Sequence, residues 1–226
     1  MNIVITGASD GIGEAMTRAF CKEHTVIMLA RNEEKLAKIA KETDAEFMVC
    51  DVREADQVKQ VFEDIVKKHG TIDVLVNNAG VIVNGDVTET EDEIIKNVID
   101  TNTLGAIYAA KYALVGMKQA KDGLIINVVS QAGVTARANR SIYNASKWAL
   151  TGFTRAIQEE ASEYGVRVTG FYPGTIYTDL FKKAGLSIDT SALTTEDIVK
   201  AVAFIINQPA TAFIPHFEIK PKYLGK

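Results

Sequence analysis

Short apolar runs alternate with longer amphipathic stretches along this chain. The short runs are rich in valine and isoleucine, and the longer stretches repeat their apolar residues at the three-to-four-residue spacing of a helix. The runs predict strands at residues 2–6, 25–30, 46–50, 72–77, 123–129, 166–172 and 212–219. The stretches between them predict helices at residues 12–23, 33–41, 54–69, 91–118, 143–164 and 195–208.

This alternation is typical of βαβ units, in which crossover helices cover a parallel sheet. The predicted fold class is α/β, with a doubly wound, Rossmann-type parallel sheet of about seven strands and helices on both faces. No internal repeat, low-complexity tract or linker divides the chain, so we expect a single domain over residues 1–226. A chain of this length can bury one continuous core.

One extended segment, residues 174–193, has no periodicity and follows the end of a predicted strand. Ligands of open α/β sheets bind beyond the carboxyl ends of the strands, and a long loop in a compact domain is usually functional. Its apolar side chains can close over a small ligand or pack on the protein, and they are Tyr177, Leu180, Phe181 and Leu186.

Composition and charge argue against several classes of function. The formal net charge is −4 without a basic stripe, which disfavours a nucleic-acid partner. No apolar run approaches the ~20 residues of a membrane span, and no secretory leader is visible. Cys21 and Cys50 are expected to be reduced thiols, which suits a cytoplasmic protein. His24, His69 and His216 lack metal-ligand spacing, so no metal site is predicted.

A glycine-rich segment joins the first predicted strand to the first predicted helix. Glycines permit a tight turn and let the backbone approach a pyrophosphate, while the helix amino terminus supplies N–H donors. Three residues separate the first two glycines, which departs from G-x-G-x-x-G, and close packing alone is the alternative role. The flanking strand and helix favour a dinucleotide site formed by Gly7, Ser9, Asp10, Gly11, Ile12 and Gly13.

The end of the second predicted strand indicates which cofactor to expect. An acidic residue there would accept a hydrogen bond from the ribose hydroxyl of NAD(H), but the chain has Ala30 and Arg31. A guanidinium favours a 2′-phosphate through charge-assisted bonds, so NADP(H) is expected in preference to NAD(H). Asp10 adds a negative charge nearby, and a solvated arginine at a helix start is the alternative.

Tyr143 and Lys147 are four residues apart in a predicted helix and therefore share a face. A free tyrosine is only about a thousandth ionised at pH 7, but a nearby ammonium favours the phenolate and lets the phenol exchange a proton. A chance Y-x-x-x-K is plausible in a chain with seven tyrosines. Ser130, after another predicted strand, can hydrogen-bond a substrate oxygen beside Tyr143. Asn102 is a poor helix former inside a helical stretch, which indicates another use for its polar groups.

Taken in order, these segments resemble the signature of the short-chain dehydrogenase/reductase family. The resemblance covers nearly the whole chain and rests on the glycine segment, Asn77-Asn78-Ala79-Gly80, Asn102, Ser130, the Tyr143/Lys147 pair and Pro173-Gly174. Residues 213–221 lack the Asp-Gly-Gly ending of ketoacyl-carrier-protein reductases and are closer to broad-specificity reductases and to hydroxy-acid or sepiapterin-like members. The resemblance therefore implies an NADP-type general reductase and disfavours a role in fatty-acid synthesis.

The resemblance also implies roles for the matching positions. Tyr143 would be the catalytic acid/base, and Lys147 would lower its pKa and hold the nicotinamide ribose. Ser130 would orient the carbonyl, and Asn102 would keep a water in a proton relay. Further cofactor contacts are implied for Asp51, Val52, Asn78, Gly80, Pro173, Gly174, Ile176 and Thr178. Family members pair through the helices that hold Asn102 and Tyr143, so a homodimer or homotetramer is implied.

The predicted function is hydride transfer between NADP(H) and a carbonyl/alcohol carbon of a small organic substrate, with Tyr143 as proton donor and acceptor. One alternative is an NADP(H)-binding regulator without turnover, which the complete set of candidate catalytic residues disfavours. Another is an NAD-linked sugar or hydroxysteroid dehydrogenase, which Arg31 disfavours. Arg137 and Arg140 precede Tyr143; inward placement would select acidic substrates, but two solvated loop arginines are favoured because arginine is mostly exposed.

Overall fold

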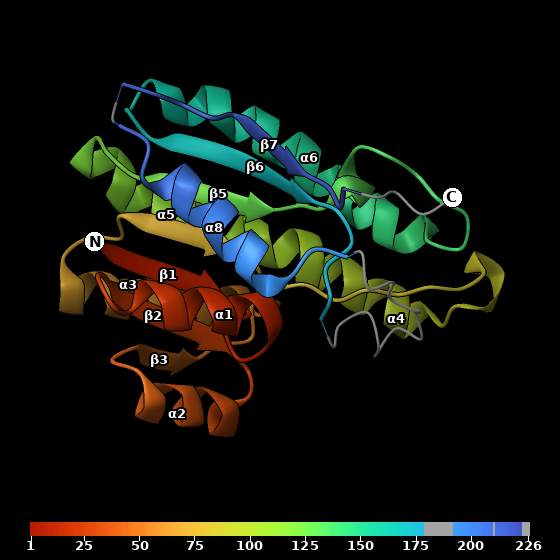
Figure 1. Ribbon diagram of the computed structural model, residues 1–226, viewed down its shortest axis with the longest axis horizontal. Helices are drawn as coiled ribbons and strands as arrows, with labels where there is room; N and C mark the ends of the chain where they lie inside the picture. The colour runs from red at the N-terminus through yellow and green to blue at the C-terminus, as the bar shows by residue number, and fades with distance from the viewer. Residues whose placement is uncertain (179–191, 210, 223–226) are drawn as a thin grey trace.

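The computed structural model describes residues 1–178, 192–209 and 211–222. Its strands form one parallel sheet in the order β3-β2-β1-β4-β5-β6-β7 (Figure 1). They are β1 (Asn2–Thr6), β2 (Thr25–Ala30), β3 (Glu46–Val49), β4 (Val74–Asn77), β5 (Leu124–Val128), β6 (Arg167–Pro173) and β7 (His216–Ile219). The predicted doubly wound sheet of seven parallel strands is confirmed.

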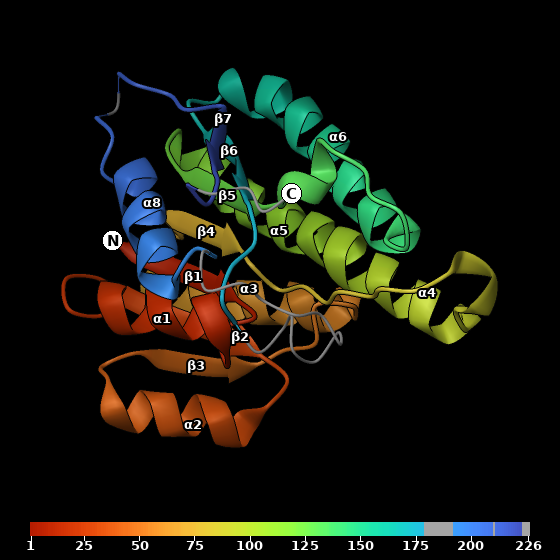
Figure 2. The same ribbon diagram turned by 45° about the vertical axis from the view of Figure 1, so that its right-hand side comes forward.

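Helices cover both faces of this sheet (Figure 2). They are α1 (Gly11–Phe20), α2 (Glu33–Glu42), α3 (Ala55–His69), α4 (Asp92–Ile99), α5 (Gly105–Ala120), α6 (Ser141–Ser162) and α8 (Thr195–Ile206). Buried residues of α1, α2 and α8 share one hydrophobic cluster with the sheet, and those of α3, α5 and α6 share another. The sheet is therefore the middle of three layers.

Burial on both faces explains why the strands read as continuous apolar runs. Successive side chains of a strand point to opposite faces. Ile3 and Ile5 of β1 accordingly pack in the cluster of α1 and α8, whereas Val4 between them packs in the cluster of α3 and α5. A single strand thus contributes to both halves of the core.

The winding of the chain reverses at β1. This strand pairs with β2 on one side and with β4 on the other, so the connections that follow β1 and β4 leave in opposite directions. A crevice opens at the carboxyl ends of the strands at such a switch point. The loops that carry the candidate site residues all leave from this edge of the sheet.

The helical stretch predicted over residues 91–118 is not one α-helix. α4 ends at Ile99, a π-helical turn covers Asp100–Leu104, and α5 begins at Gly105. A Cβ on Gly105 would lie 2.7 Å from Cγ2 of Val52, so α5 starts in close contact with the segment after β3. Single π-turns inside helices are frequent at functional sites, and Asn102 lies in this one.

Most of the other predicted helix and strand bounds lie within a few residues of those in the structure. The clearest difference is the last strand, predicted from residue 212, which begins at His216. Pro215 precedes it, and proline has no N–H to offer a neighbouring strand. Its carbonyl still accepts a hydrogen bond from the backbone N–H of Gly170 at 3.1 Å.

Candidate active site

A cleft of about 810 Å³ lies beyond the carboxyl ends of the strands. It collects residues from the segments that follow six of the strands, β1 through β6. Its lining holds these candidate site residues: Gly7, Ser9, Asp10, Gly11, Ile12, Arg31, Asp51, Val52, Asn78, Gly80, Ser130, Tyr143, Lys147, Pro173, Gly174, Ile176 and Thr178. Gly13 and Asn102 are not part of the lining and contact residues that are. The fold thus brings residues from distant parts of the sequence to one cavity.

The three glycines of the first loop are required for different structural reasons. Gly7 has a positive φ of 67°, and a Cβ there would lie 2.7 Å from Cα of Ala79. A Cβ on Gly13 would lie 2.3 Å from the carbonyl oxygen of Gly7. A Cβ on Gly11 would meet only the side chain of Thr178, at 3.8 Å. Gly7 and Gly13 therefore allow close packing, whereas Gly11 leaves bare backbone at the cleft, where a pyrophosphate fits.

The segment after β4 braces the glycine loop. The side-chain amide of Asn78 donates hydrogen bonds to the carbonyl oxygens of Thr6 and Gly7, at 2.9 and 3.2 Å. The hydroxyl of Thr6 accepts hydrogen bonds from the backbone N–H groups of Asn78 and Ala79, both at 3.0 Å. The amide of Asn78 thus holds two loops together beneath the cleft.

One end of the cleft carries positive charge. Arg31, directly after β2, is exposed, and its guanidinium lies 3.9 Å from a carboxylate oxygen of Asp51. Arg53 bonds that carboxylate far more closely, through three contacts of 2.6–3.1 Å, and these bonds hold the pKa of Asp51 below its usual value. Because Arg53 already neutralises Asp51, the charge of Arg31 stays available to an anionic ligand.

Lys35 adds a second cation at the same end. It comes from the first turn of α2 and lines the cleft beside Arg31. Its ammonium lies 2.9 Å from a carboxylate oxygen of Asp10. The negative charge of Asp10, which counted against a phosphate from sequence alone, is therefore paired within the protein.

Ser130 follows β5 in a strained conformation. Its φ is 116°, a left-handed value that costs a residue with a side chain on the order of 1–3 kcal/mol. Its hydroxyl oxygen accepts a hydrogen bond from the backbone N–H of Ala132 at 3.2 Å and also bonds with the hydroxyl of Tyr143. The strained turn holds the serine hydroxyl against the tyrosine at the cleft.

Tyr143 and Lys147 lie one turn apart on α6, and both are buried. Burial raises the pKa of Tyr143, while its bond with Ser130 and the positive charge of Arg140 act in the opposite direction. Burial also lowers the pKa of Lys147 to about 8. The Lys147 ammonium donates a hydrogen bond to the carbonyl of Val128 at 3.1 Å. A hydroxyl able to exchange a proton and a cation able to support its phenolate thus share one wall of the cleft.

Residues 1–188 match the family model described as short chain dehydrogenase. The chain belongs to the short-chain dehydrogenase family. A farnesol dehydrogenase from Aedes aegypti is 32% identical over 231 residues, which cover 96% of this chain and 94% of the relative.

Solved structures of family members superpose over almost the entire chain. An alcohol dehydrogenase from Thermococcus sibiricus, complexed with 5-hydroxy-NADP, has a TM-score of 0.91 and 26% identity, with 100% of this chain and 98% of that chain covered. The closed form of a serine dehydrogenase, complexed with NADP⁺, has a TM-score of 0.89 and 29% identity, with 97% and 94% covered. Both belong to the same fold as this short-chain dehydrogenase.

Asn102 of this short-chain dehydrogenase is fully buried beside the cleft. Its side chain accepts a hydrogen bond from the N–H of Val81 and donates one to the carbonyl of the same residue, both at 2.8 Å. It also donates to the hydroxyl of Ser146 at 3.0 Å. These contacts tie the segment after β4 to α6, and the proton-relay role of Asn102 stays a prediction.

Sequence reasoning missed three residues that support the site. Lys35 could have been found from its position four residues after Arg31, at the start of the next helix. Arg53 gave no signal, because its contact with Asp51 depends on how the segment after β3 folds. Asn144 donates hydrogen bonds to the carbonyls of Ala132 and Thr135, at 2.8 and 2.6 Å, and so holds the loop that follows Ser130.

The remaining expectations concern the long loop, metals and membranes. Tyr177 is exposed, and Leu180, Phe181 and Leu186 lie outside the described residues. No group of three His, Cys, Asp or Glu residues in the described part of the chain is placed to hold a metal ion. Within the same residues, no helix has the length and apolar character needed to cross a bilayer.

Proposed function

We propose that this short-chain dehydrogenase transfers a hydride between NADP(H) and the carbonyl/alcohol carbon of a small organic substrate. The observation that carries the proposal is the meeting of Ser130, Tyr143 and Lys147 in the same cleft as the glycine loop. Bare backbone at Gly11 leaves room for a dinucleotide against the glycine loop. When bound, the nicotinamide supplies or accepts the hydride.

The protein's own residues handle the oxygen and its proton. In reduction, the Ser130 hydroxyl donates a hydrogen bond to the carbonyl oxygen, and Tyr143 gives its phenolic proton to the same oxygen as the carbon becomes an alcohol. Each reduction therefore consumes one hydride and one proton, and Tyr143 is reprotonated from solvent. Lys147 stabilises the phenolate and binds the nicotinamide ribose, and Asn102 keeps a water in the relay.

Cofactor preference is proposed from the charges at the far end of the cleft. Arg31 supplies a cation where a 2′-phosphate would lie, because Asp51 is engaged by Arg53, and Lys35 offsets the negative charge of Asp10 beside it. NADP(H) is therefore favoured over NAD(H). The NADP-type ligands of the Thermococcus alcohol dehydrogenase and of the serine dehydrogenase support the same choice. Asp51 and Val52 would lie by the adenine, and Ile176 and Thr178 by the carboxamide.

A homodimer or homotetramer in the cytoplasm is the proposed working form. Val115 on α5 and Trp148 on α6 are 57% and 49% exposed, which leaves apolar surface on the helices through which family members pair. Cys21 and Cys50 are free thiols, which suits a reducing compartment. Light scattering on the purified protein tests the assembly, and a mass of one 24.6 kDa chain would contradict it.

The decisive experiment is a screen for NADPH consumption over aldehydes, ketones, keto acids and diketones. At least one carbonyl class is expected to accelerate the loss of NADPH absorbance, with the matching alcohol as product. Isothermal titration with NADPH runs in parallel. Tight NADPH binding without turnover of any carbonyl or alcohol would contradict the proposed enzymatic function. It would instead support the alternative of an NADP(H)-binding regulator.

A further inference from the structure

Three basic side chains line the cleft in the part of the chain that the structure describes. Lys147 is buried in the cleft wall, and Lys35 is paired with Asp10 at 2.9 Å. Arg31 is exposed and forms an ion pair with Asp51 at the longer distance of 3.9 Å. The other bonds of the Asp51 carboxylate therefore decide how far the charge of Arg31 is available to a ligand.

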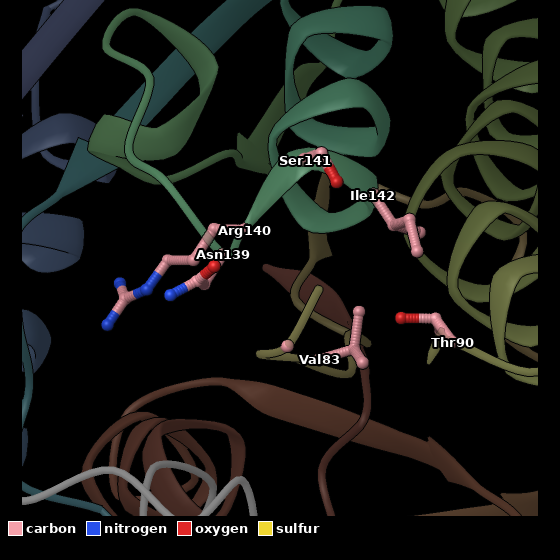
Figure 3. A pocket seen from close by; sticks show the side chains of 7 residues that line it. Val83, Thr90, Asn139, Arg140, Ser141 and Ile142 are labelled. Atoms are coloured by element: carbon pink, nitrogen blue, oxygen red, sulfur yellow. The ribbon is translucent and has the colours of Figure 1, made fainter. Parts of the chain in front are cut away.

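The two arginines of the loop before α6 do not add to this charge. Neither Arg137 nor Arg140 is among the described residues that line the cleft. Arg137 is exposed, and Arg140 lines a separate, narrow crevice together with Val83 and Thr90 (Figure 3). Recognition of a charged group on the cofactor is therefore left to the segments that follow β2 and β3.

Arg53 engages both oxygens of the Asp51 carboxylate. Its Nε lies 3.0 Å from Oδ1 and 3.1 Å from Oδ2, its Nη2 lies 2.6 Å from Oδ2, and its backbone N–H donates to Oδ1 at 3.1 Å. A planar guanidinium matches a carboxylate in this two-pronged way. At 3.9 Å, Arg31 is too far from Oδ2 for a hydrogen bond. Arg53 is thus the preferred partner of this carboxylate.

A contact with α4 holds the Arg53 side chain in place. Its Nη1 donates a hydrogen bond to the side-chain oxygen of Asn97, on α4, at 2.9 Å. Neither Arg53 nor Asn97 is among the described residues of the cleft lining, whereas Asp51 is. The side chains of Arg53 and Asp51 are 31% and 19% exposed, against 61% for Arg31, so the pair is the better shielded from water. Two residues outside the cleft therefore fix a charged group inside it.

Loss of Arg53 would leave the charge of Asp51 unbalanced beside Arg31. A charge within ~4–6 Å strongly favours an opposite charge and disfavours a like one. The carboxylate would then attract the guanidinium of Arg31 and repel a phosphate bound there. A ribose hydroxyl carries no charge and would not be repelled. Because NADP(H) and NAD(H) differ only in this phosphate, the loss should weaken binding of the first cofactor far more than that of the second.

We propose that Arg53, held by Asn97, is a positioning residue that sets the preference for NADP(H) over NAD(H). Arg53 acts through Asp51, because its bonds with this carboxylate leave the guanidinium of Arg31 to the 2′-phosphate. The inference rests on the proposed function, in which Arg31 binds that phosphate. It adds two residues outside the cleft to the selection of the cofactor and leaves the hydride transfer unchanged.

Isothermal titration of the cofactor-free protein with NADPH and with NADH tests the inference, because it measures affinity without turnover. Arg53→Ala is expected to lower the ratio of the NADH Kd to the NADPH Kd by about tenfold, as for the weakening of one charge-assisted bond. Asp51→Asn removes the charge that Arg53 balances, so adding Arg53→Ala to that variant should leave the ratio unchanged. Both cofactors carry the same adenine, so any loss of adenine contacts at Asp51 cancels in the ratio.

Further variants separate this role from a structural one. Arg53→Lys keeps the charge without the fork and should give an intermediate ratio, and Asn97→Ala should lower the ratio less than Arg53→Ala does. Arg18→Ala is the matched control, because Arg18 is 37% exposed and bonds two carboxylates outside the cleft lining, and it should leave the ratio unchanged. The pKa of Asp51, followed by NMR, should rise in Arg53→Ala, because the bonds that lower it are lost.

The outcomes also distinguish this inference from the proposed function. A preference for NADPH that survives Arg53→Ala would overturn the role of Arg53 and leave the enzyme and its cofactor intact. A preference that falls equally with and without the Asp51 carboxylate would do the same. Equal affinity of wild type for NADPH and NADH would contradict the proposed cofactor choice and the role of Arg53 together. Absence of turnover on every carbonyl would contradict the hydride transfer, while the titrations would still decide the role of Arg53.

Discussion

The ammonium nitrogen of Lys147 lies 5.9 Å from the centre of the Tyr143 ring. Both groups are buried, and burial acts against the charge of each, since it raises the pKa of the phenol and lowers that of the ammonium. A phenolate and an ammonium formed together would compensate one another. The pair is therefore suited to a step in which Tyr143 gives up its proton while Lys147 stays charged.

Replacement of Tyr143 by phenylalanine tests the proton transfer directly. Tyr143→Phe keeps the ring and removes the transferable proton, so kcat should fall by about 10²–10⁴-fold while the Kd for NADPH stays nearly unchanged. Tyr164→Phe, at an exposed tyrosine near the end of α6, serves as the control. Retention of more than about a tenth of the wild-type kcat, well outside the range for general acid/base catalysis, would remove Tyr143 from its role.

Lys147 should destabilise the cofactor-free protein near neutral pH. Its pKa is lowered from 10.5 to about 8, so between these values the unfolded chain binds more protons than the folded one. Stability from this group therefore rises with pH through that window. We expect Lys147→Met to raise the free energy of unfolding at pH 7 by up to about 3 kcal/mol and to abolish turnover.

Urea denaturation at pH 7 and pH 10 measures this effect. The advantage of Lys147→Met should shrink as pH rises from 8 toward 10.5, because the folded wild type then holds Lys147 neutral and the unfolded chain gives up that proton at a progressively lower cost. Lys38→Met, at an exposed position on α2, should show no such change. A Lys147→Met variant that is less stable than wild type at pH 7 would refute the destabilising role of Lys147. So would a difference in free energy of unfolding that does not change with pH.

Arg31 should control the choice between cofactors. Arg31→Asp removes a partner of the 2′-phosphate and adds an acceptor for the ribose hydroxyl, so the ratio of kcat/KM for NADPH to that for NADH should fall by roughly ten- to a hundredfold. Arg155→Asp makes the same charge change at an exposed site on α6 and should leave the ratio unaltered. A wild-type enzyme that already prefers NADH would show that Arg31 does not select the cofactor through its 2′-phosphate.

Two helical glycines should respond in opposite ways to alanine. Gly13→Ala places a Cβ 2.3 Å from the carbonyl oxygen of Gly7, so it should lower the melting temperature and weaken NADPH binding by more than about tenfold, as expected for overpacking of about 1–3 kcal/mol. Gly116→Ala on α5 meets no atom within 4 Å and should stabilise the protein by about 0.5–1 kcal/mol. Thermal melts and NADPH titrations measure both, and equal behaviour of the two variants would contradict the packing role of Gly13.

The order of elements and the candidate catalytic residues could be predicted from local patterns. Continuous apolar runs such as residues 2–6 identify strands that are buried on both faces of the sheet, because successive side chains point to opposite faces and both faces are covered by helices. The spacing of Tyr143 and Lys147 predicts a shared helix face from the 3.6-residue repeat alone. These conclusions need no knowledge of distant contacts.

Contacts between residues far apart in sequence could not be predicted from local patterns. Asn102 lies in the π-helical turn that divides the stretch predicted as one helix, and its side chain accepts a hydrogen bond from the backbone N–H of Val81. No local periodicity signals that break. Lys35 reaches Asp10 from another element, and Arg53 engages the carboxylate that Arg31 would otherwise attract. The amino-acid sequence specifies which chemical groups are present and which elements carry them. Only the packing of those elements decided which charges neutralise each other and which stay free, because that depends on through-space distance.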